Sequence, residues 1–272
     1  MPEGPEVHRM ACKLARVLVD RPLEDLELRY PTIQAHAARL SEQVVTSVES
    51  RGKAFLIRFG EEGTLYVHLQ LYGRWNIHRV TTKPRTKRTL RVALVTATHQ
   101  ALLYSATDLE VLSDAGVASH PYLARLGPDL FDAELTAEQL AERMMSKAFG
   151  GRQLGALMLD QGFVGGIGNY LRAEMLYLAG IAPRRKGRSL HIDEATGLGE
   201  AILEVGRRAL AQNGTTTDEE LLAVARRRGW PKRRVRHYVF GRDDQACFVC
   251  GSDVLRANVG GRRMYWCASC QV

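Results

Sequence analysis

The chain has 272 residues, of which 38 are Lys or Arg and 30 are Asp or Glu, giving a formal net charge of +8. Hydrophobic residues make up 45% and charged residues 25% of the chain, which excludes a wholly disordered or collagen-like protein. The length suits about two domains, with a core large enough to need no disulfide bonds. The surplus of basic residues is compatible with a polyanionic partner.

The sequence lacks targeting and membrane-spanning patterns. No stretch reaches the roughly 18 continuous apolar residues of a transmembrane helix. Residues 1–6 lack the basic start and apolar core of a signal peptide. We therefore expect a cytoplasmic protein whose thiols stay reduced. An odd number of cysteines fits this expectation, with Cys12 alone and the other four near the C-terminus.

The first half of the chain predicts one helix followed by short strands. Residues 5–19 predict an amphipathic helix, because apolar side chains recur there with the 3.6-residue period. The chain then changes to short apolar runs separated by turns such as Gly60-Glu61-Glu62-Gly63, which favours a β-sandwich or barrel. Four runs predict strands: residues 54–59, 64–69, 90–95 and 101–104.

The second half predicts helices. The strand pattern breaks at residues 122–133, which indicates a domain boundary. Residues 162–169 contain four glycines and predict a turn between helices, because glycine destabilises a helix interior. Residues 212–224 fit either a functional loop or a plain connector. Four segments have helical periodicity: residues 135–145, 151–161, 170–179 and 192–211.

Four cysteines near the C-terminus have the spacing of a metal site. Cys247-x-x-Cys250 and Cys267-x-x-Cys270 are separated by sixteen residues, and Gly260-Gly261 between them predicts a hairpin turn. Two such pairs supply the four thiolates that Zn²⁺ takes in structural sites. Because the protein would fill every ligand position, this zinc would stabilise structure and take no part in chemistry. Two unrelated thiol pairs are the alternative interpretation.

Two stretches of the chain hold basic residues and no acidic ones. Residues 226–242 contain eight Lys or Arg interleaved with aromatic residues, and residues 79–91 contain six. Either stretch alone fits a solvated loop. Together with a zinc finger they favour phosphate binding, which positions a protein on nucleic acid without reading its sequence.

Four motifs are spread along the chain from residue 2 to residue 270. They are Pro2-Glu3-Gly4-Pro5-Glu6, Arg51-Gly52-Lys53, Gly168-Asn169-Tyr170 and the four-cysteine finger. In this combination the chain resembles the formamidopyrimidine-DNA glycosylase and endonuclease VIII family. Gln70-Leu71-Tyr72-Gly73 and the segment Leu103-Tyr104-Ser105-Ala106-Thr107-Asp108 are more similar to the endonuclease VIII branch, which favours oxidised pyrimidines.

The resemblance implies an α+β multidomain fold in three parts. These are a β-sandwich catalytic domain with a flanking helix at residues 1–125, a helix–two-turn–helix DNA-binding domain at residues 126–240, and a zinc-finger β-hairpin at residues 241–272. It implies one structural Zn²⁺, damaged double-stranded DNA bound in a cleft between the first two domains, a monomeric protein and no membrane association. The protein would be cytoplasmic, of bacterial type, and nucleoid-associated when bound to DNA.

The implied activity is that of a bifunctional DNA glycosylase and AP lyase in base excision repair. Pro2, once Met1 is removed, would attack C1′ of the sugar with its secondary amine. A chain-terminal amine has a pKa near ~8, so a useful fraction is neutral and nucleophilic. Glu3 would shuttle a proton, and Glu6, one helical turn on, would have a supporting role. Without the resemblance, these are ordinary helix-start residues.

The resemblance also assigns residues to strand cleavage and DNA binding. Lys53 would donate a proton in β-elimination, although by itself it fits an exposed surface lysine. Arg262 would clamp phosphate and serve δ-elimination. Arg263 keeps that assignment open, because relatives often have Arg-Pro-Phe where this chain has Arg-Arg-Met. The implied DNA contacts are Gln70, Leu71 and Tyr72, which would fill the gap left by an extruded nucleotide, together with Arg125 and Asn169.

Three other functions stay open at this point. The chain fits the 8-oxoguanine- and formamidopyrimidine-directed branch of the same family, a non-catalytic zinc-finger DNA-binding protein, or an RNA- or ribosome-associated zinc protein. The preferred lesion, the opposite base and the role of residues 212–224 cannot be read from the sequence.

Overall fold

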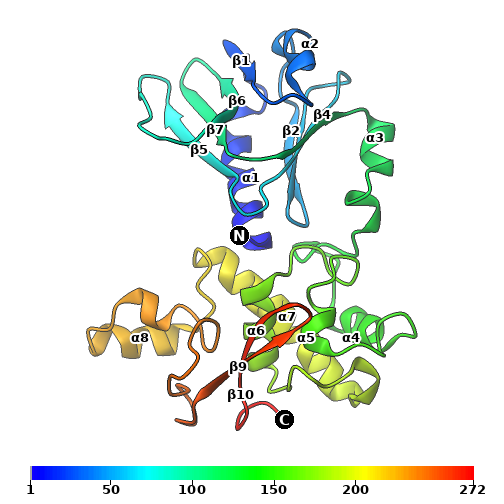
Figure 1. Ribbon diagram of the computed structural model, residues 1–272, viewed down its shortest axis with the longest axis vertical. Coiled ribbons are helices and arrows are strands. Elements are labelled where there is room, and N and C mark those ends of the chain that lie inside the picture. The colour runs from blue at the N-terminus through cyan, green and yellow to red at the C-terminus, as the bar shows by residue number, and fades with distance from the viewer. Residues whose placement is uncertain (1) are drawn as a thin grey trace. The chain divides into compact units, whose positions relative to one another are not determined.

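The computed structural model describes residues 2–272 and divides into two compact units (Figure 1). One unit comprises the described residues up to Arg125, and the other is Leu126–Val272. Met1, whose removal the resemblance requires, lies outside the described residues. Among residues 2–272, no helix has the length and apolar composition that a bilayer span requires.

The first unit is a β-sandwich of two four-stranded antiparallel sheets, which confirms the expected sandwich. The strands of one sheet are, in spatial order, β1 (Asp25–Leu28), β6 (Leu90–Val95), β7 (His99–Tyr104) and β5 (Arg74–Arg79). The strands of the other are β2 (Ser47–Arg51), β3 (Ala54–Arg58), β4 (Thr64–His68) and β8 (Asp108–Leu112). The four predicted strands are all present, and β3 and β4 form the predicted hairpin.

Helix α1 (Gly4–Leu18) confirms the predicted amphipathic helix and shares one core with both sheets. Its Leu14 and Leu18 are fully buried together with Phe55 of one sheet and Leu94 of the other. Each such side chain contributes about 1.5–3 kcal/mol by leaving water. The shorter helices of this unit are α2 (Ala37–Ser41) and α3 (Asp114–Ser119), with 3₁₀ turns at Gln34–His36 and Leu123–Arg125.

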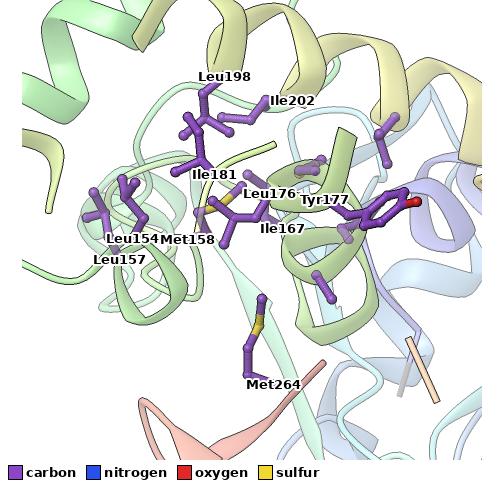
Figure 2. Packing of buried hydrophobic residues seen from close by; sticks show 14 of the residues in the cluster. Leu154, Leu157, Met158, Ile167, Leu176, Tyr177, Ile181, Leu198, Ile202 and Met264 are labelled. Atoms are coloured by element: carbon purple, nitrogen blue, oxygen red, sulfur yellow. The ribbon is translucent and has the colours of Figure 1, made fainter. Parts of the chain in front are cut away.

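The second unit packs helices and a C-terminal hairpin around one core. Its helices are α4 (Ala137–Met145), α5 (Leu154–Leu157), α6 (Asn169–Leu178), α7 (Ile192–Ala211) and α8 (Glu219–Arg227), with 3₁₀ turns at Gly187–Ser189 and Lys232–Val235. The hairpin strands are β9 (Val254–Val259) and β10 (Arg262–Cys267). Met264 of β10 lies in the same cluster as Leu176 and Ile202 of the helices (Figure 2). The hairpin therefore shares its hydrophobic core with the helices.

The predicted helix at residues 151–161 is wrong, because only the single turn α5 forms there. The backbone N–H groups of Leu154 and Gly155 donate to the carbonyls of Arg185 and Pro183, at 2.8 and 2.9 Å. Both amides are thus bonded to residues 183–185, which are close in space and distant in sequence. The apolar periodicity reports burial correctly, but tertiary hydrogen bonds replace most of the helix.

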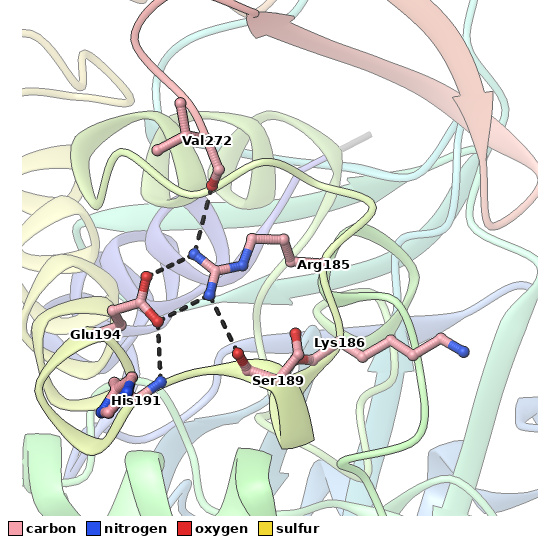
Figure 3. Close-up of polar contacts among 6 residues, drawn as sticks. All are labelled: Arg185, Lys186, Ser189, His191, Glu194 and Val272. Carbon is pink, nitrogen blue, oxygen red and sulfur yellow. Dashed lines mark hydrogen bonds and ion pairs between the residues drawn. The ribbon is translucent and has the colours of Figure 1, made fainter.

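A polar cluster around Arg185 ties the C-terminal residue to the helices (Figure 3). The Arg185 guanidinium donates to both carboxylate oxygens of Glu194, at 2.6 and 2.7 Å, and to the carbonyls of Ser189 and Val272. The hydrogen bonds from Arg185 and from the backbone N–H of His191 lower the pKa of Glu194 to about 2. The last residue of the chain is thus held against the start of α7.

Glu174 of α6 is a buried carboxylate that fixes two other chain segments. It accepts the backbone N–H groups of Tyr238, Val239 and Phe240, at 2.7, 2.9 and 2.9 Å. The Thr216 hydroxyl donates to it at 2.6 Å. A carboxylate is stable away from water only when its oxygens are hydrogen-bonded, and four donors meet that requirement here.

Replacing Glu174 with Ala leaves three buried backbone N–H groups without this acceptor. At roughly 1–3 kcal/mol for each unsatisfied buried group, we expect the unfolding free energy of the second unit to fall by about 3 kcal/mol or more. Urea denaturation followed by circular dichroism measures the change. Glu200→Ala, at an exposed position of α7, is the matched control. An unfolding midpoint equal to that of the wild type would contradict the role assigned to Glu174.

Candidate functional site

The start of α1 holds three of the predicted site residues. Pro2 is half-buried, and Glu3, whose side chain is buried, is the N-terminal cap residue of the helix. The Glu6 carboxylate accepts the backbone N–H of Glu3 at 3.0 Å, as in a capping box. Glu6 therefore has a structural role at the helix start, and it brings a second carboxylate beside Pro2.

A pocket of about 790 Å³ lies within the first unit along α1, from Pro2 before the helix start to Val17 near its end, and beside β5. Its size is typical of small-molecule sites. Pro2 and Glu6 line it at the helix start, and apolar side chains such as Met10 and Trp75 contribute to its wall. Its cationic lining residues are Arg9, Lys13, Arg16 and Arg74. The pocket can accommodate an anionic ligand that reaches Pro2.

Lys53 lies in the turn between β2 and β3, next to Gly52, whose φ of +59° favours glycine. Lys53 is buried, and its backbone N–H donates to the Tyr122 hydroxyl at 2.9 Å. The alternative interpretation as an exposed surface lysine is therefore wrong. Helix α1 packs against β2, and His8 Nδ1 lies 3.0 Å from Ser50 Oγ, so this hairpin is held against the helix.

His68 at the end of β4 is a neighbour of Lys53 that sequence reasoning missed. Burial lowers the pKa of its imidazole, while the Asp108 charge raises it and the Lys53 charge lowers it. Its Nδ1 accepts the backbone N–H of Gln70 at 3.2 Å, and its ring packs edge-on against Tyr122. No local spacing marks His68, because its partners come from several segments far apart in sequence.

The loop between β4 and β5 exposes two large apolar side chains. Leu71 is 65% and Tyr72 72% exposed, so neither side chain is packed in the core of the described structure. The loop is fixed by Gln70, which has a φ of +49° and donates through Nε2 to Asp108 at 3.1 Å. Arg88 donates to the Tyr72 carbonyl at 2.8 Å. Apolar side chains presented on a fixed loop are typical of a binding surface.

Arg125 ends the 3₁₀ turn Leu123–Arg125 and is exposed. Its Nε donates to the Pro121 carbonyl at 2.7 Å, which holds the side-chain stem. The guanidinium is thereby presented from a fixed turn at the end of the first unit.

Asn169 is the first residue of α6. Its Nδ2 donates to the Arg263 carbonyl at 2.9 Å. Arg262 and Arg263 begin β10, directly after the Gly260-Gly261 turn, and both are exposed. The structure thus brings Asn169 and the two hairpin arginines together.

Arg172 of α6 is a fully buried cation that sequence reasoning missed. Its guanidinium donates to the carbonyls of Val259, Arg262 and Arg263, at 3.0, 3.2 and 3.3 Å, and also to that of Gly155. It therefore clamps the hairpin turn onto the helices. Two opposite charges, Arg172 and Glu174, within an otherwise largely apolar helix were the signal that could have revealed it.

The four cysteines lie together and can hold one metal ion. Their sulfurs are all within 4.8 Å of one another, with 3.9 Å between Cys247 and Cys270 and 3.4 Å between Cys250 and Cys267. Zn–S bonds of about 2.3 Å place the sulfurs of a tetrahedral site roughly 3.8 Å apart. The Tyr177 hydroxyl is 3.2 Å from Cys247 Sγ. Donor type and spacing therefore fit a tetrahedral thiolate site.

Two family models match the chain. The formamidopyrimidine-DNA glycosylase N-terminal domain matches residues 1–108, and the formamidopyrimidine-DNA glycosylase H2TH domain matches residues 126–220. Endonuclease 8 of Escherichia coli (strain K12 / DH10B) is 39% identical over 271 residues, covering 100% of both chains. Endonuclease 8 of Escherichia coli O6:K15:H31 (strain 536 / UPEC) gives the same values.

Solved structures share the fold at lower identity. The wild-type Lactococcus lactis Fpg (MutM) in complex with DNA containing N7-benzyl-Fapy-dG has a TM-score of 0.81 at 22% identity, covering 99% of both chains. MutM in complex with DNA containing carbocyclic 8-oxo-G has a TM-score of 0.80 at 21% identity, covering 100% of both chains. These likenesses extend over the full architecture described above.

Replacing Arg172 with Met removes the donors that hold the hairpin turn. A loss of about 2 kcal/mol of local stability corresponds to roughly 30-fold faster amide hydrogen exchange at residues 259–262. Exchange followed by mass spectrometry measures this, with Arg207→Met, at an exposed position of α7, as the control. Unchanged protection of the turn would show that the guanidinium is not needed there.

Proposed function

We propose that this chain, which belongs to the formamidopyrimidine-DNA glycosylase and endonuclease VIII family, excises oxidised pyrimidines from duplex DNA through a Schiff base on Pro2. Membership follows from the two matching domain models and from 39% identity over the full length to Endonuclease 8. The enzyme class follows from membership: the chain is a DNA glycosylase and AP lyase of base excision repair. The observation that carries the proposed Schiff-base mechanism is the buried Glu3 directly after Pro2 at the start of α1.

The first chemical step uses Pro2 and Glu3. Once Met1 is removed, the Pro2 ring nitrogen attacks C1′ of the deoxyribose, a C–N bond forms, and the bond from C1′ to the base breaks. A terminal amine with a pKa near ~8 is partly neutral at physiological pH and can attack. Glu3 supplies a proton to the ring oxygen or the departing base. Its burial supports this role, because a carboxyl shielded from water exchanges its proton with a bound substrate and not with solvent.

The second step cleaves the strand. The sugar ring then opens: the C1′–O4′ bond breaks, O4′ takes a proton, and an iminium forms between Pro2 and C1′. The iminium makes the C2′ proton acidic, so its removal expels the 3′ phosphate in β-elimination. Lys53, buried in a turn held against α1, is suited to donate a proton in this step. Arg262 is suited to neutralise the 5′ phosphate as it departs in δ-elimination, because an always-charged planar fork matches phosphate oxygens. The clamp by Arg172 on the Arg262 carbonyl supports a fixed position for that side chain.

DNA binding requires the damaged nucleotide to leave the base stack. Extrusion costs a few kcal/mol, and side chains inserted into the gap offset part of that cost. The exposure of Leu71 and Tyr72, with Gln70 fixing their loop, supports this insertion role. Arg125 and Asn169 would contact phosphates on the backbone.

The preference for oxidised pyrimidines is supported by sequence rather than by geometry. The chain carries Gln70-Leu71-Tyr72-Gly73, the pattern of the endonuclease VIII branch, and is 39% identical to proteins named Endonuclease 8. Its likeness to Fpg structures, at 21–22% identity, supports the fold alone.

We further propose that the four thiolates hold one structural Zn²⁺. When bound, the ion would cross-link the ends of the β9–β10 hairpin, and with four protein ligands it would leave no position open for chemistry. Thiols stay reduced in the cytoplasm, which supports a cytoplasmic protein. We further propose that it is monomeric and joins the nucleoid when bound to DNA. In function, residues 1–125 would be catalytic, residues 126–240 would bind DNA, and residues 241–272 would form the finger.

Borohydride reduction tests the Pro2 mechanism. With a duplex that carries dihydrouracil, the wild type should form a covalent protein–DNA adduct, and Pro2→Gly should lower adduct yield by at least ~100-fold. Glu3→Gln should slow base excision by ~10²–10⁴-fold and still cleave a preformed abasic site, because no base remains to be protonated. Denaturing gels resolve both products.

Parallel duplexes with thymine glycol and 8-oxoguanine test the lesion class. Faster excision of 8-oxoguanine than of the oxidised pyrimidines would assign the chain to the other branch. A wild-type protein with Met1 removed that forms no adduct with any duplex would refute the Schiff base.

Cys250→Ser removes one of the four ligands and should lower bound zinc from about one equivalent per chain toward zero. DNA affinity should fall at the same time, while the first unit keeps its fold. Elemental analysis measures the metal, and Cys12→Ser, at an exposed position of α1 outside the cluster, is the control. Full zinc content in Cys250→Ser would contradict the assigned ligand set.

A further inference from the structure

Residues 218–236 form an extension of the second unit that we term the basic arm. It consists of α8 and the chain that follows it through the 3₁₀ turn Lys232–Val235, on which α8 packs. In Figure 1, α8 lies apart from α4 to α7 within this unit. The matching H2TH model ends at residue 220, so nearly all of the arm lies beyond it. The fold that the family model describes does not explain why the arm is present.

The base of the arm is firmly held. The Thr217 hydroxyl donates to the Val235 carbonyl at 2.6 Å, and the Thr216 N–H donates to the Arg236 carbonyl at 2.9 Å. Asp218 caps α8 by accepting the N–H of Leu221 at 2.8 Å. The side chains of both threonines are buried, so they connect the arm to the unit and are not presented to a ligand.

The charges of the arm are separated along it. Its acidic residues, Asp218, Glu219 and Glu220, lie at the start of α8. Only one arm cation is paired with a carboxylate among the described residues: Arg226 with Glu219, at 3.6 Å. The exposed cations lie at the other end: Arg226, Arg227, Arg228, Lys232, Arg233, Arg234 and Arg236. Attraction to the C-terminal end of the helix dipole accounts for the first three and not for those that follow the helix.

Trp230 orders two of these arginines. The Cζ atoms of Arg234 and Arg228 lie 4.1 and 5.1 Å from the centroid of its ring. Gly229, with a φ of +63°, and Pro231 make the tight turn that presents the ring. Stacking fixes the plane of each guanidinium and leaves the N–H groups at its edge available to an acceptor. A guanidinium held in this way loses less entropy when it binds a phosphate.

We propose that the basic arm binds the phosphate backbone of duplex DNA and adds to affinity, not to the chemical step. The proposal rests on the proposed function only for the identity of the partner. Seven exposed cations, two of them ordered by stacking, match closely spaced phosphates. Phosphate contacts carry no sequence information, so we expect binding through the arm to be independent of sequence.

The salt dependence of binding tests the arm. The slope of log K against log salt is negative, and each lost phosphate contact lowers its absolute value by about 0.9. Replacing Arg227, Arg228 and Arg234 with Gln should lower the absolute slope for an undamaged duplex by about 2–3, measured between roughly 50 and 200 mM salt. The same variant should bind this duplex at least ~10-fold more weakly. Single-turnover excision at saturating enzyme should stay unchanged.

The matched control replaces Arg184, Arg188 and Arg207 with Gln. These are exposed residues of the same unit, and the variant loses the same charge. Its slope should change by less than about 1. Arg234→Gln alone should lower the absolute slope by about 1, so the test holds even where the triple variant fails to fold.

Each outcome supports or overturns the arm proposal. Equal slopes for the arm and control variants would overturn it, as would a lower excision rate at saturation, which would put the arm at the lesion. Loss of structured-RNA binding with an unchanged DNA slope would assign the arm to RNA instead. Because the assay uses undamaged DNA, it succeeds or fails independently of the Pro2 adduct.

Discussion

Arg172 and Glu174 are charged side chains in α6 with almost no access to water. A buried charge is tolerated only when hydrogen bonds replace its hydration, and this requirement fixes where its partners lie. Arg172 needs carbonyl oxygens and finds them at the hairpin turn, whereas Glu174 needs donors and finds them at residues 216 and 238–240. The hydrogen bonds of these two side chains therefore fix the hairpin turn, residue 216 and residues 238–240 against α6.

The same helix begins with Asn169, whose side chain meets the same hairpin. The positions of Asn169 and Arg262, which would meet phosphate, thus both depend on this one helix. In the first unit α1 has the corresponding role. Its apolar face joins the sandwich core, and its first turn holds Glu3 and Glu6 beside Pro2. In each unit one candidate site residue, Glu3 or Asn169, lies at the start of a helix that is held by the core.

Periodicity and spacing predicted most elements and the cysteine cluster, because both are local properties of the sequence. The prediction failed at residues 151–161, where amides bond to a distant segment instead of completing a helix. Arg172, Glu174 and His68 were missed for the same reason, since the Val259 carbonyl that binds Arg172 is 87 positions away. Pro2, Glu3 and Lys53 were singled out only by family resemblance. Their residue types are ordinary at a helix start or a turn, and only the burial of Glu3 and Lys53 distinguishes them.

Arginine has three different roles in the second unit, and its surroundings decide which one applies. Arg172 is enclosed by carbonyl oxygens, so its charge stabilises structure and cannot attract a ligand. Arg234 is stacked on Trp230 with its edge exposed, so its charge is ordered and still available. Arg262 is exposed on a backbone that a buried arginine holds. A net charge of +8 therefore says little about DNA binding by itself. The informative quantity is how many guanidinium groups combine exposure with a fixed position, because only these can meet phosphates without a large loss of side-chain entropy.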